Sequence, residues 1–304
     1  MMEKILNILI RFVIKPMLSS KAPLWLQRFA GVLSSFVLRK APNCTTKRIV
    51  LGSCPTLLVS QKEKTKQEQG KEKSQLHVLY LHGGAYVMGG ISSHSKLATW
   101  ISHTLCAEVW LPEYSLSPEH TFPVARNQLV ACYQELLDSG ISSENIIIMG
   151  DSAGGGLTLT TAIAIRDAGI PQPAALVLIS PWVDLTLSGS TMQTHINRDN
   201  MLSMDWLTFG ATSYAGCHSI SHPECSPLFA DLADLPPMLI QVGTEEILLD
   251  DAKRLAEKAT NAGVETALEE YANMGHVFQL TAGHVATANR ALKAMAAFCK
   301  EHHN

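Results

Sequence analysis

The sequence predicts an α/β protein whose mostly parallel, twisted sheet is covered by helices on both faces. Short apolar runs alternate with segments of helical periodicity from residue 76 onward. Runs such as Leu76–Leu81 and Asn145–Met149 are apolar almost throughout, which is typical of strands buried on both faces. The 304 residues are 46% hydrophobic and 17% charged, which is enough apolar material for one large core.

The predicted elements follow one another in a regular order. Buried-type strands are expected at 76–81, 108–111, 145–149, 174–180, 238–242 and 266–271. Helices are expected at 122–137, 153–168, 250–262 and 284–300. The stretch 61–75 is almost purely polar and is predicted to be a solvated loop. Because ligands of such sheets bind at the carboxyl ends of the strands, functional residues should directly follow strands.

Composition argues against several classes of function. The formal net charge is −3 and the chain carries no nucleic-acid-binding motif, so we expect no nucleic-acid partner. Seven cysteines without CxxC spacing favour free thiols in a reducing compartment, and we expect a cytoplasmic protein. Cys217, His218, His222 and Cys225 lie close in sequence, but their spacing matches no closed zinc motif, so we expect no metal.

The apolar N-terminal stretch is interrupted by charge. Ile5–Leu18 contains Arg11, Lys15 and Pro16, and it is shorter than the roughly 20 apolar residues of a membrane-spanning helix. No small-residue cleavage site follows it, which argues against a signal peptide. Two interpretations remain: an amphipathic helix docked on the protein, or a helix in peripheral contact with a membrane surface.

A nucleophile motif lies between a predicted strand and a predicted helix. Residues 150–154, GDSAG, match G-x-S-x-G in the strand–turn–helix context that this motif requires. Glycines on either side give the sharp turn the space it needs, and the serine hydroxyl is held out of the sheet. We therefore predict Ser152 as the nucleophile, with the backbone N–H of Ala153 directed at the reaction centre.

A second glycine-rich segment, HGGAY at 82–86, follows the first buried strand. Consecutive glycines let the backbone approach a substrate closely and leave amides free to donate. Acyl transfer needs such donors at the developing oxyanion. Gly83 and Gly84 are the predicted donors, with Ala153 as the third.

A serine hydroxyl is a weak nucleophile without an adjacent base. Among twelve histidines, His276 follows the last predicted strand and is the predicted base. The acid should come from the loop after 238–242, which gives the chain order serine, acid, histidine. Glu245 lies nearest the strand end and is preferred, ahead of Asp250 and then Glu246.

Together these motifs resemble the hormone-sensitive-lipase-like family of bacterial carboxylesterases, in the α/β-hydrolase superfamily. The resemblance extends from about Leu79 to the C-terminus. It rests on HGGAY at 82–86, YSLSPEH at 114–120, GDSAGG at 150–155, SPWVDL at 180–185 and GHVF at 275–278. The sequence departs from the family at Ala85, where a third glycine is usual, and at Glu245, where aspartate is common.

The resemblance implies the α/β-hydrolase fold and hydrolysis of carboxylic esters through an acyl-enzyme, without a metal or organic cofactor. We interpret the chain as a serine carboxylesterase for short- to medium-chain acyl esters. A lipase or an amidase with the same triad is the alternative. A non-catalytic small-molecule receptor is a further alternative, against which the presence of His276 argues.

The resemblance also implies a helical cap over the site. The cap would comprise residues 1–45 and 185–225, and the core would comprise residues 46–184 and 226–304. Four aromatic residues are candidates for substrate binding, with packing inside the protein as the competing role: Tyr86, Trp206, Phe209 and Tyr214. Family members often dimerise through the final strand and helix, so a homodimer is an expectation of the resemblance.

Overall fold

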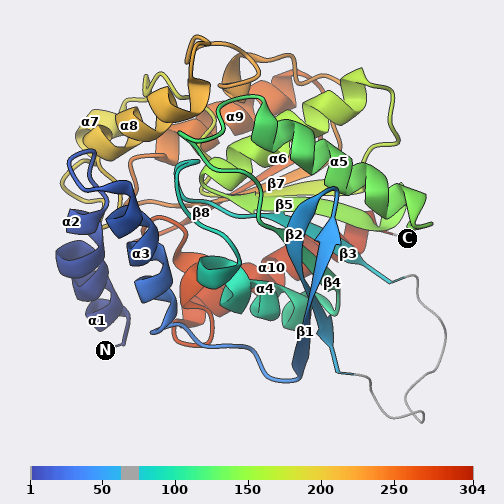
Figure 1. Cartoon of the computed structure of the whole chain (residues 1–304), viewed down its shortest axis with the longest axis horizontal. Helices are drawn as coiled ribbons and strands as arrows, with labels where there is room; N and C mark the ends of the chain where they lie inside the picture. Colours follow the sequence, from blue (N-terminus) through green and yellow to red (C-terminus); the bar gives the residue numbers. More distant parts are fainter. Residues whose placement is uncertain (1, 63–74, 304) are drawn as a thin grey trace.

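The computed structural model describes residues 2–62 and 75–303 and contains an eight-stranded sheet (Figure 1). The strand order is β1-β2-β4-β3-β5-β6-β7-β8. The strands span Cys44–Leu51 (β1), Cys54–Gln61 (β2), His77–Leu81 (β3), Glu108–Pro112 (β4), Ile146–Asp151 (β5), Ala175–Ile179 (β6), Met238–Gly243 (β7) and Thr266–Tyr271 (β8). Strand β2 pairs antiparallel with β1 and β4, and every other pairing is parallel. The predicted fold class is therefore confirmed. The predicted loop at 61–75 lies largely outside the described residues.

Helices cover both faces of the sheet (Figure 1). One face carries α5 (Val124–Asp138), α6 (Ala153–Asp167) and α9 (Leu249–Asn261), and the other carries α4 (Ile91–Leu105) and α10 (Ala286–His302). Strand β5 shows why its sequence is apolar throughout. Ile146 and Ile148 belong to the first core cluster, Ile147 and Met149 belong to the second, and all four are fully buried. Successive side chains point to opposite faces, so both sets need apolar residues.

Helix α4 is the main element that the sequence prediction did not contain. Its buried face includes Ser93, His94 and Ser102 beside Leu97 and Ile101. Polar residues at buried positions weaken the apolar periodicity from which a helix is recognised. Two of these polar residues, Ser93 and His94, line the cavity described below, which accounts for the weak pattern.

Two helical segments far apart in sequence pack against each other beside the core (Figure 1). The first contains α1 (Met2–Leu9), a π-helical segment (Ile10–Ile14), α2 (Lys15–Met17) and α3 (Leu24–Ser35), and the second contains α7 (Thr191–Thr194) and α8 (Met204–Ala215). Trp206 Nε1 donates to Gln27 Oε1 at 2.9 Å, and Lys15 Nζ donates to the carbonyl oxygen of Asp199 at 2.7 Å. These contacts join the two segments that the resemblance assigns to the cap, and the division into a core and a cap stays a prediction. No helix among the described residues is long and apolar enough to cross a membrane.

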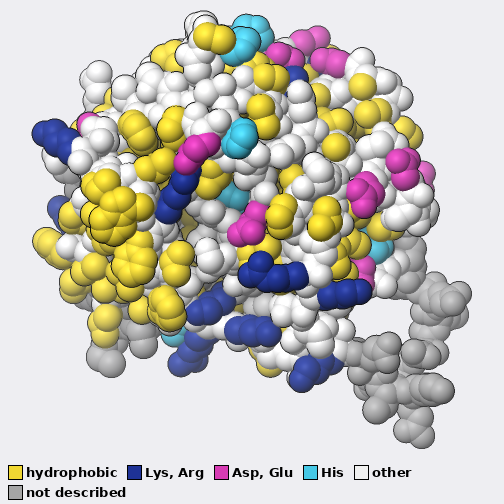
Figure 2. Space-filling model, viewed as in Figure 1, with side chains coloured by type: hydrophobic (Ala, Val, Ile, Leu, Met, Phe, Trp, Pro, Cys, Tyr) yellow, Lys and Arg dark blue, Asp and Glu magenta, His cyan; other side chains and the backbone are white. Residues whose placement is uncertain are grey.

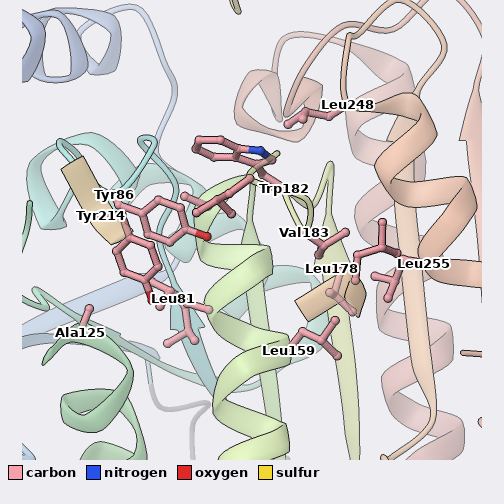
Figure 3. Close-up of a cluster of buried hydrophobic side chains, with 14 of the residues drawn as sticks. Leu81, Tyr86, Ala125, Leu159, Leu178, Trp182, Val183, Tyr214, Leu248 and Leu255 are labelled. Carbon is pink, nitrogen blue, oxygen red and sulfur yellow. The ribbon is translucent and has the colours of Figure 1, made fainter. Parts of the chain in front are cut away.

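Aromatic side chains join α8 to the core (Figure 3). The rings of Tyr86 and Tyr214 stack with centroids 3.8 Å apart, and Trp182 packs beside Tyr86. Large aromatic side chains contribute strongly to burial of apolar area. These ring contacts fix α8 to the core.

Candidate active site

Ser152 occupies a strained turn between β5 and α6. Its φ of +54° and ψ of −121° are rarely adopted by a residue with a side chain. The Ser152 N–H donates to the carbonyl oxygen of Ile179 in the neighbouring strand at 2.9 Å, which helps to hold the turn. A Cβ atom on Gly150 would overlap with the carbonyl oxygen of Gly154, and one on Gly154 would overlap with that of Leu81. The glycines of G-x-S-x-G are therefore required by the backbone.

His276 lies in the loop after β8, against the buried carboxylate of Glu246. The distance from His276 Nδ1 to Glu246 Oε2 is 2.7 Å, and the two side chains are 2% and 0% exposed. The other carboxylate oxygen, Oε1, accepts from Ser180 Oγ and from the Gly243 N–H, both at 2.8 Å. Both oxygens of Glu246 are thus held in place. Because a carboxylate only accepts, we assign the proton to Nδ1, which leaves Nε2 as the base.

The protonation of His276 reflects opposing influences. Burial lowers its pKa, but the charge and hydrogen bond of Glu246, together with the charges of Asp199 and Asp151, raise it. The net result is a pKa above the ordinary value of 6.5. This arrangement stabilises an imidazolium that forms during a reaction.

The prediction of Glu245 as the partner of His276 is wrong. Glu245 instead pairs with Arg198: its Oε2 accepts from Arg198 Nε at 2.8 Å, and its Oε1 accepts from Arg198 Nη2 at 2.7 Å. The Glu245 side chain is 24% exposed. Asp250, the second candidate, accepts from the Ser190 hydroxyl instead. Proximity to the strand end was the misleading criterion. The better signal was that Glu246 directly precedes the apolar, buried run Ile247–Leu249.

The Gly83 amide is engaged by a buried acid. Its N–H donates to Asp151 Oδ1 at 3.0 Å, and the Tyr80 hydroxyl donates to the same oxygen at 2.7 Å. Burial raises the pKa of Asp151, but the charge and hydrogen bond of His94 and the Tyr80 hydrogen bond outweigh burial and leave it lowered. An ionised Asp151 therefore holds the first glycine of the loop. Gly83 is not available as an oxyanion donor, and that prediction is corrected.

Other amides at the site remain available. Within the described residues, the backbone N–H groups of Gly84, Ala85 and Ala153 donate no hydrogen bond. Ala85 takes a left-handed φ of +51°, which the family's usual glycine would adopt without strain. Gly84 and Ala153 keep their predicted availability, and Ala85 is a candidate that sequence reasoning missed.

A cavity of about 140 Å³ connects these groups. Ser152, His276, Gly84, Asp151 and His94 line one part of it. A single water needs only about 10–15 Å³ of such space, so the cavity has room for a larger ligand. Much of the remaining wall is apolar and comes from the cap and the loops that follow β3 and β8, including Leu6, Ile10, Ile14, Met88, Met201 and Trp206.

Comparisons with known proteins show the family to which the chain belongs. The model of a family described as having the alpha/beta hydrolase fold matches residues 78–280. An acetyl-hydrolase of Streptomyces hygroscopicus is 40% identical over 223 residues, which cover 73% of this chain and 75% of that protein. The crystal structure of an esterase from the bacterial hormone-sensitive lipase family superposes with a TM-score of 0.90 at 30% identity, covering 100% of this chain and 98% of the other.

The chain belongs to the hormone-sensitive-lipase-like esterases of the α/β-hydrolase superfamily. This esterase is a carboxylic ester hydrolase. It is also similar to EstE5, in a crystal soaked with p-nitrophenyl butyrate, with a TM-score of 0.88 and 33% identity over 99% of this chain and 98% of the other.

Of the four aromatic residues predicted to contact substrate in this esterase, only Trp206 lines the cavity. Tyr86 and Tyr214 are each 2% exposed and stack on each other inside the core (Figure 3). Phe209 is partly buried and packs against the same core cluster. These three predictions are corrected. Phe209 and Tyr214 lie on the part of α8 that packs against the core, and Tyr86, in the loop after β3, stacks on Tyr214. The acyl wall missed by sequence reasoning includes Leu6, Ile10 and Ile14 of the N-terminal segment.

Proposed function

We propose that the esterase hydrolyses short- to medium-chain acyl esters, with Ser152 as nucleophile, His276 as general base and Glu246 as the acid. One observation carries the proposal. The imidazole of His276 contacts a fully buried carboxylate at 2.7 Å, beside the cavity that Ser152 also lines. A base oriented by a buried acid near a strained serine is the arrangement that activates a hydroxyl.

The reaction then follows from these positions. Ser152 Oγ attacks the ester carbonyl carbon while His276 Nε2 takes the hydroxyl proton. The tetrahedral intermediate collapses, the bond to the alcohol oxygen breaks, and His276 returns the proton to the leaving alcohol. Water then attacks the acyl-serine in the same way and releases the carboxylic acid. Glu246 holds the imidazole through Nδ1 and stabilises the imidazolium.

The negative oxygen of each intermediate needs preorganised donors. Gly84 and Ala153 are the proposed donors, with Ala85 as the third in place of Gly83. Removing one such donor typically lowers kcat by about 10²–10³-fold. Asp151 acts as a positioning residue in this proposal, because its bond to Gly83 fixes the loop that carries Gly84.

The apolar cavity supports an acyl chain of limited length. Its wall is built largely of aliphatic side chains from the cap, which favours small apolar acyl groups over peptides. The butyrate ester used with EstE5 is a suitable first substrate. In a series of p-nitrophenyl esters from two to sixteen carbons, we expect kcat/KM to peak at a short or medium chain. A steady rise to sixteen carbons would indicate a lipase, and matching rates on anilides would indicate an amidase.

Covalent labelling tests the nucleophile. A fluorophosphonate should modify the wild type once, at Ser152, as located by peptide mass spectrometry. The Ser152→Ala variant should remain unlabelled. Ser93→Ala is the matched control, since Ser93 lines the same cavity and bonds to His94 rather than to His276. Labelling of Ser152→Ala at another serine would contradict the assignment.

The homodimer and the cytoplasmic location stay predictions. Light scattering of the purified esterase tests the first of these, and fractionation of cells that express it tests the second. The proposed substrate is a small-molecule ester, in keeping with the esterase relatives.

A further inference from the structure

The N-terminal helical segment is apolar on two sides. Its inner side lines the active-site cavity through Leu6, Leu9, Ile10 and Ile14. Its outer side leaves Ile5, Ile8 and Phe12 exposed by 51%, 58% and 68%. A helix on the surface of a water-soluble domain normally turns one apolar stripe inward and presents polar residues to water. The outer side of this segment therefore needs an explanation of its own.

Helix α3 extends the same surface. Trp25, Phe29 and Phe36 are 69%, 50% and 73% exposed. Figure 2 shows hydrophobic side chains gathered over the α1–α3 region, whereas those on the rest of the visible face are more scattered. We call these six residues the outer cap surface: Ile5, Ile8, Phe12, Trp25, Phe29 and Phe36. Contiguous exposed apolar patches mark interaction sites.

Positive charge accompanies this surface. The first 48 residues contain nine Lys and Arg and a single acidic residue, Glu3, in a chain whose formal net charge is −3. Four of the cations are exposed in or beside α1–α3: Arg11, Lys21, Arg39 and Lys40. Arg28 is instead paired with Glu119. Figure 2 shows Lys and Arg side chains near the hydrophobic cluster and along the adjoining lower edge.

The combination of an apolar face and flanking cations matches a negatively charged phospholipid surface. Apolar side chains enter the boundary between headgroups and acyl chains, and the cations bind the anionic headgroups. A second copy of the chain fits less well, because it would bring the same cations against one another. The inner side of the same segment already forms part of the cavity wall, so docking would bring the cavity close to lipid.

We propose that the outer cap surface docks on an anionic phospholipid surface. The esterase would then meet apolar esters where they concentrate, at the lipid–water boundary. That consequence rests on the proposed function, whereas docking itself does not.

Vesicle co-sedimentation tests docking without any hydrolysis. The wild type and Ser152→Ala should both sediment with vesicles of phosphatidylglycerol and phosphatidylcholine, and salt should weaken the binding. In the double variant Phe12→Gln/Trp25→Gln we expect partition to fall at least about tenfold, from loss of two apolar anchors. In Arg11→Gln/Lys21→Gln we expect a comparable fall on anionic vesicles, because each cation near the surface contributes to binding.

Matched controls keep the test specific. Val50→Thr and Phe229→Gln alter exposed apolar residues outside α1–α3, at 66% and 41% exposure, and should bind vesicles like the wild type. Circular dichroism verifies the folding of every variant, and rates on a water-soluble ester without vesicles do so for the variants that keep Ser152. Docking is contradicted if the wild type does not sediment, or if the Phe12/Trp25 variant binds like the controls. It is also contradicted if the wild type forms a dimer in lipid-free buffer that this variant abolishes, since a second copy would then occupy the surface.

Discussion

The core side and the cap side of the cavity are held by different kinds of contact. On the core side, the carboxylates of Glu246 and Asp151 are 0% and 3% exposed, and each accepts several hydrogen bonds. On the cap side, the Arg198–Glu245 pair is 52% and 24% exposed, and Ser20 bonds to Asp205 at an exposed position. Buried charge-assisted bonds fix geometry strongly, whereas exposed pairs contribute about 0–1 kcal/mol. The reacting groups are thus more firmly positioned than the cap.

Two neighbouring glutamates mark the boundary between these regions. Glu246 turns into the core and orients His276, and Glu245 turns outward and binds a cap arginine. The same loop therefore serves both sides of the cavity. Substituting one of the two glutamates at a time should change the activity by very different amounts.

The largest effect is expected on the core side, at Ser152. Ser152→Ala removes the attacking oxygen, and kcat on p-nitrophenyl butyrate should fall by about 10⁴-fold or more. Circular dichroism and Tm, which should be close to those of the wild type, control for misfolding. Retention of even a tenth of the activity would remove Ser152 from the mechanism.

The pH dependence is the next effect in size. His276 must be neutral to act as a base, and its pKa is raised above 6.5. We therefore expect kcat/KM to fall about tenfold per pH unit below that pKa, and to level off above it. In Glu246→Gln the loss of the neighbouring charge should lower the pKa of His276 and move the inflection to lower pH. An unchanged inflection in that variant would contradict the pairing.

On the cap side, the hydrogen bond between Trp206 and Gln27 is buried. Trp206→Phe removes the N–H group that donates to Gln27 Oε1. Because Gln27 is fully buried, its side-chain carbonyl is left without a donor. We expect a loss of about 1–3 kcal/mol in the free energy of unfolding. Trp25→Phe, at a 69% exposed position, is the matched control and should change little. Denaturant titration measures both, and equal losses would show that the buried bond contributes nothing.

The smallest effect is expected at Asp205. This exposed carboxylate accepts hydrogen bonds from Ser19 and Ser20, and these bonds join the two cap segments. Asp205→Ala should cost at most about 1 kcal/mol and leave kcat on a short ester within about twofold. A larger loss of stability would show that the cap is as firmly held as the core.

Sequence reasoning reached the core side better than the cap side. Ser152 and His276 follow predicted strands. The turn at Ser152 also requires glycines on both sides, and these glycines form a motif that can be recognised in a single sequence. The choice between Glu245 and Glu246 depends on which way a turn directs adjacent side chains, and closeness to the strand end does not reveal that direction. The engagement of Gly83 likewise depends on Asp151, which lies far away in sequence. Tyr86 of the core and Tyr214 of the cap are aromatic residues of a type common in ligand pockets, and only tertiary packing shows that they stack on each other in the interior.

The two glutamates provide the most direct measurement. The kcat/KM of Glu246→Gln and Glu245→Gln on p-nitrophenyl butyrate should be compared at a pH well above the pKa of His276. We predict a loss of about 10²–10⁴-fold for Glu246→Gln, and a change within about threefold for Glu245→Gln, which loses only an exposed ion pair. The opposite ranking, or equal losses, would contradict the assignment of Glu246 as the acid that orients His276.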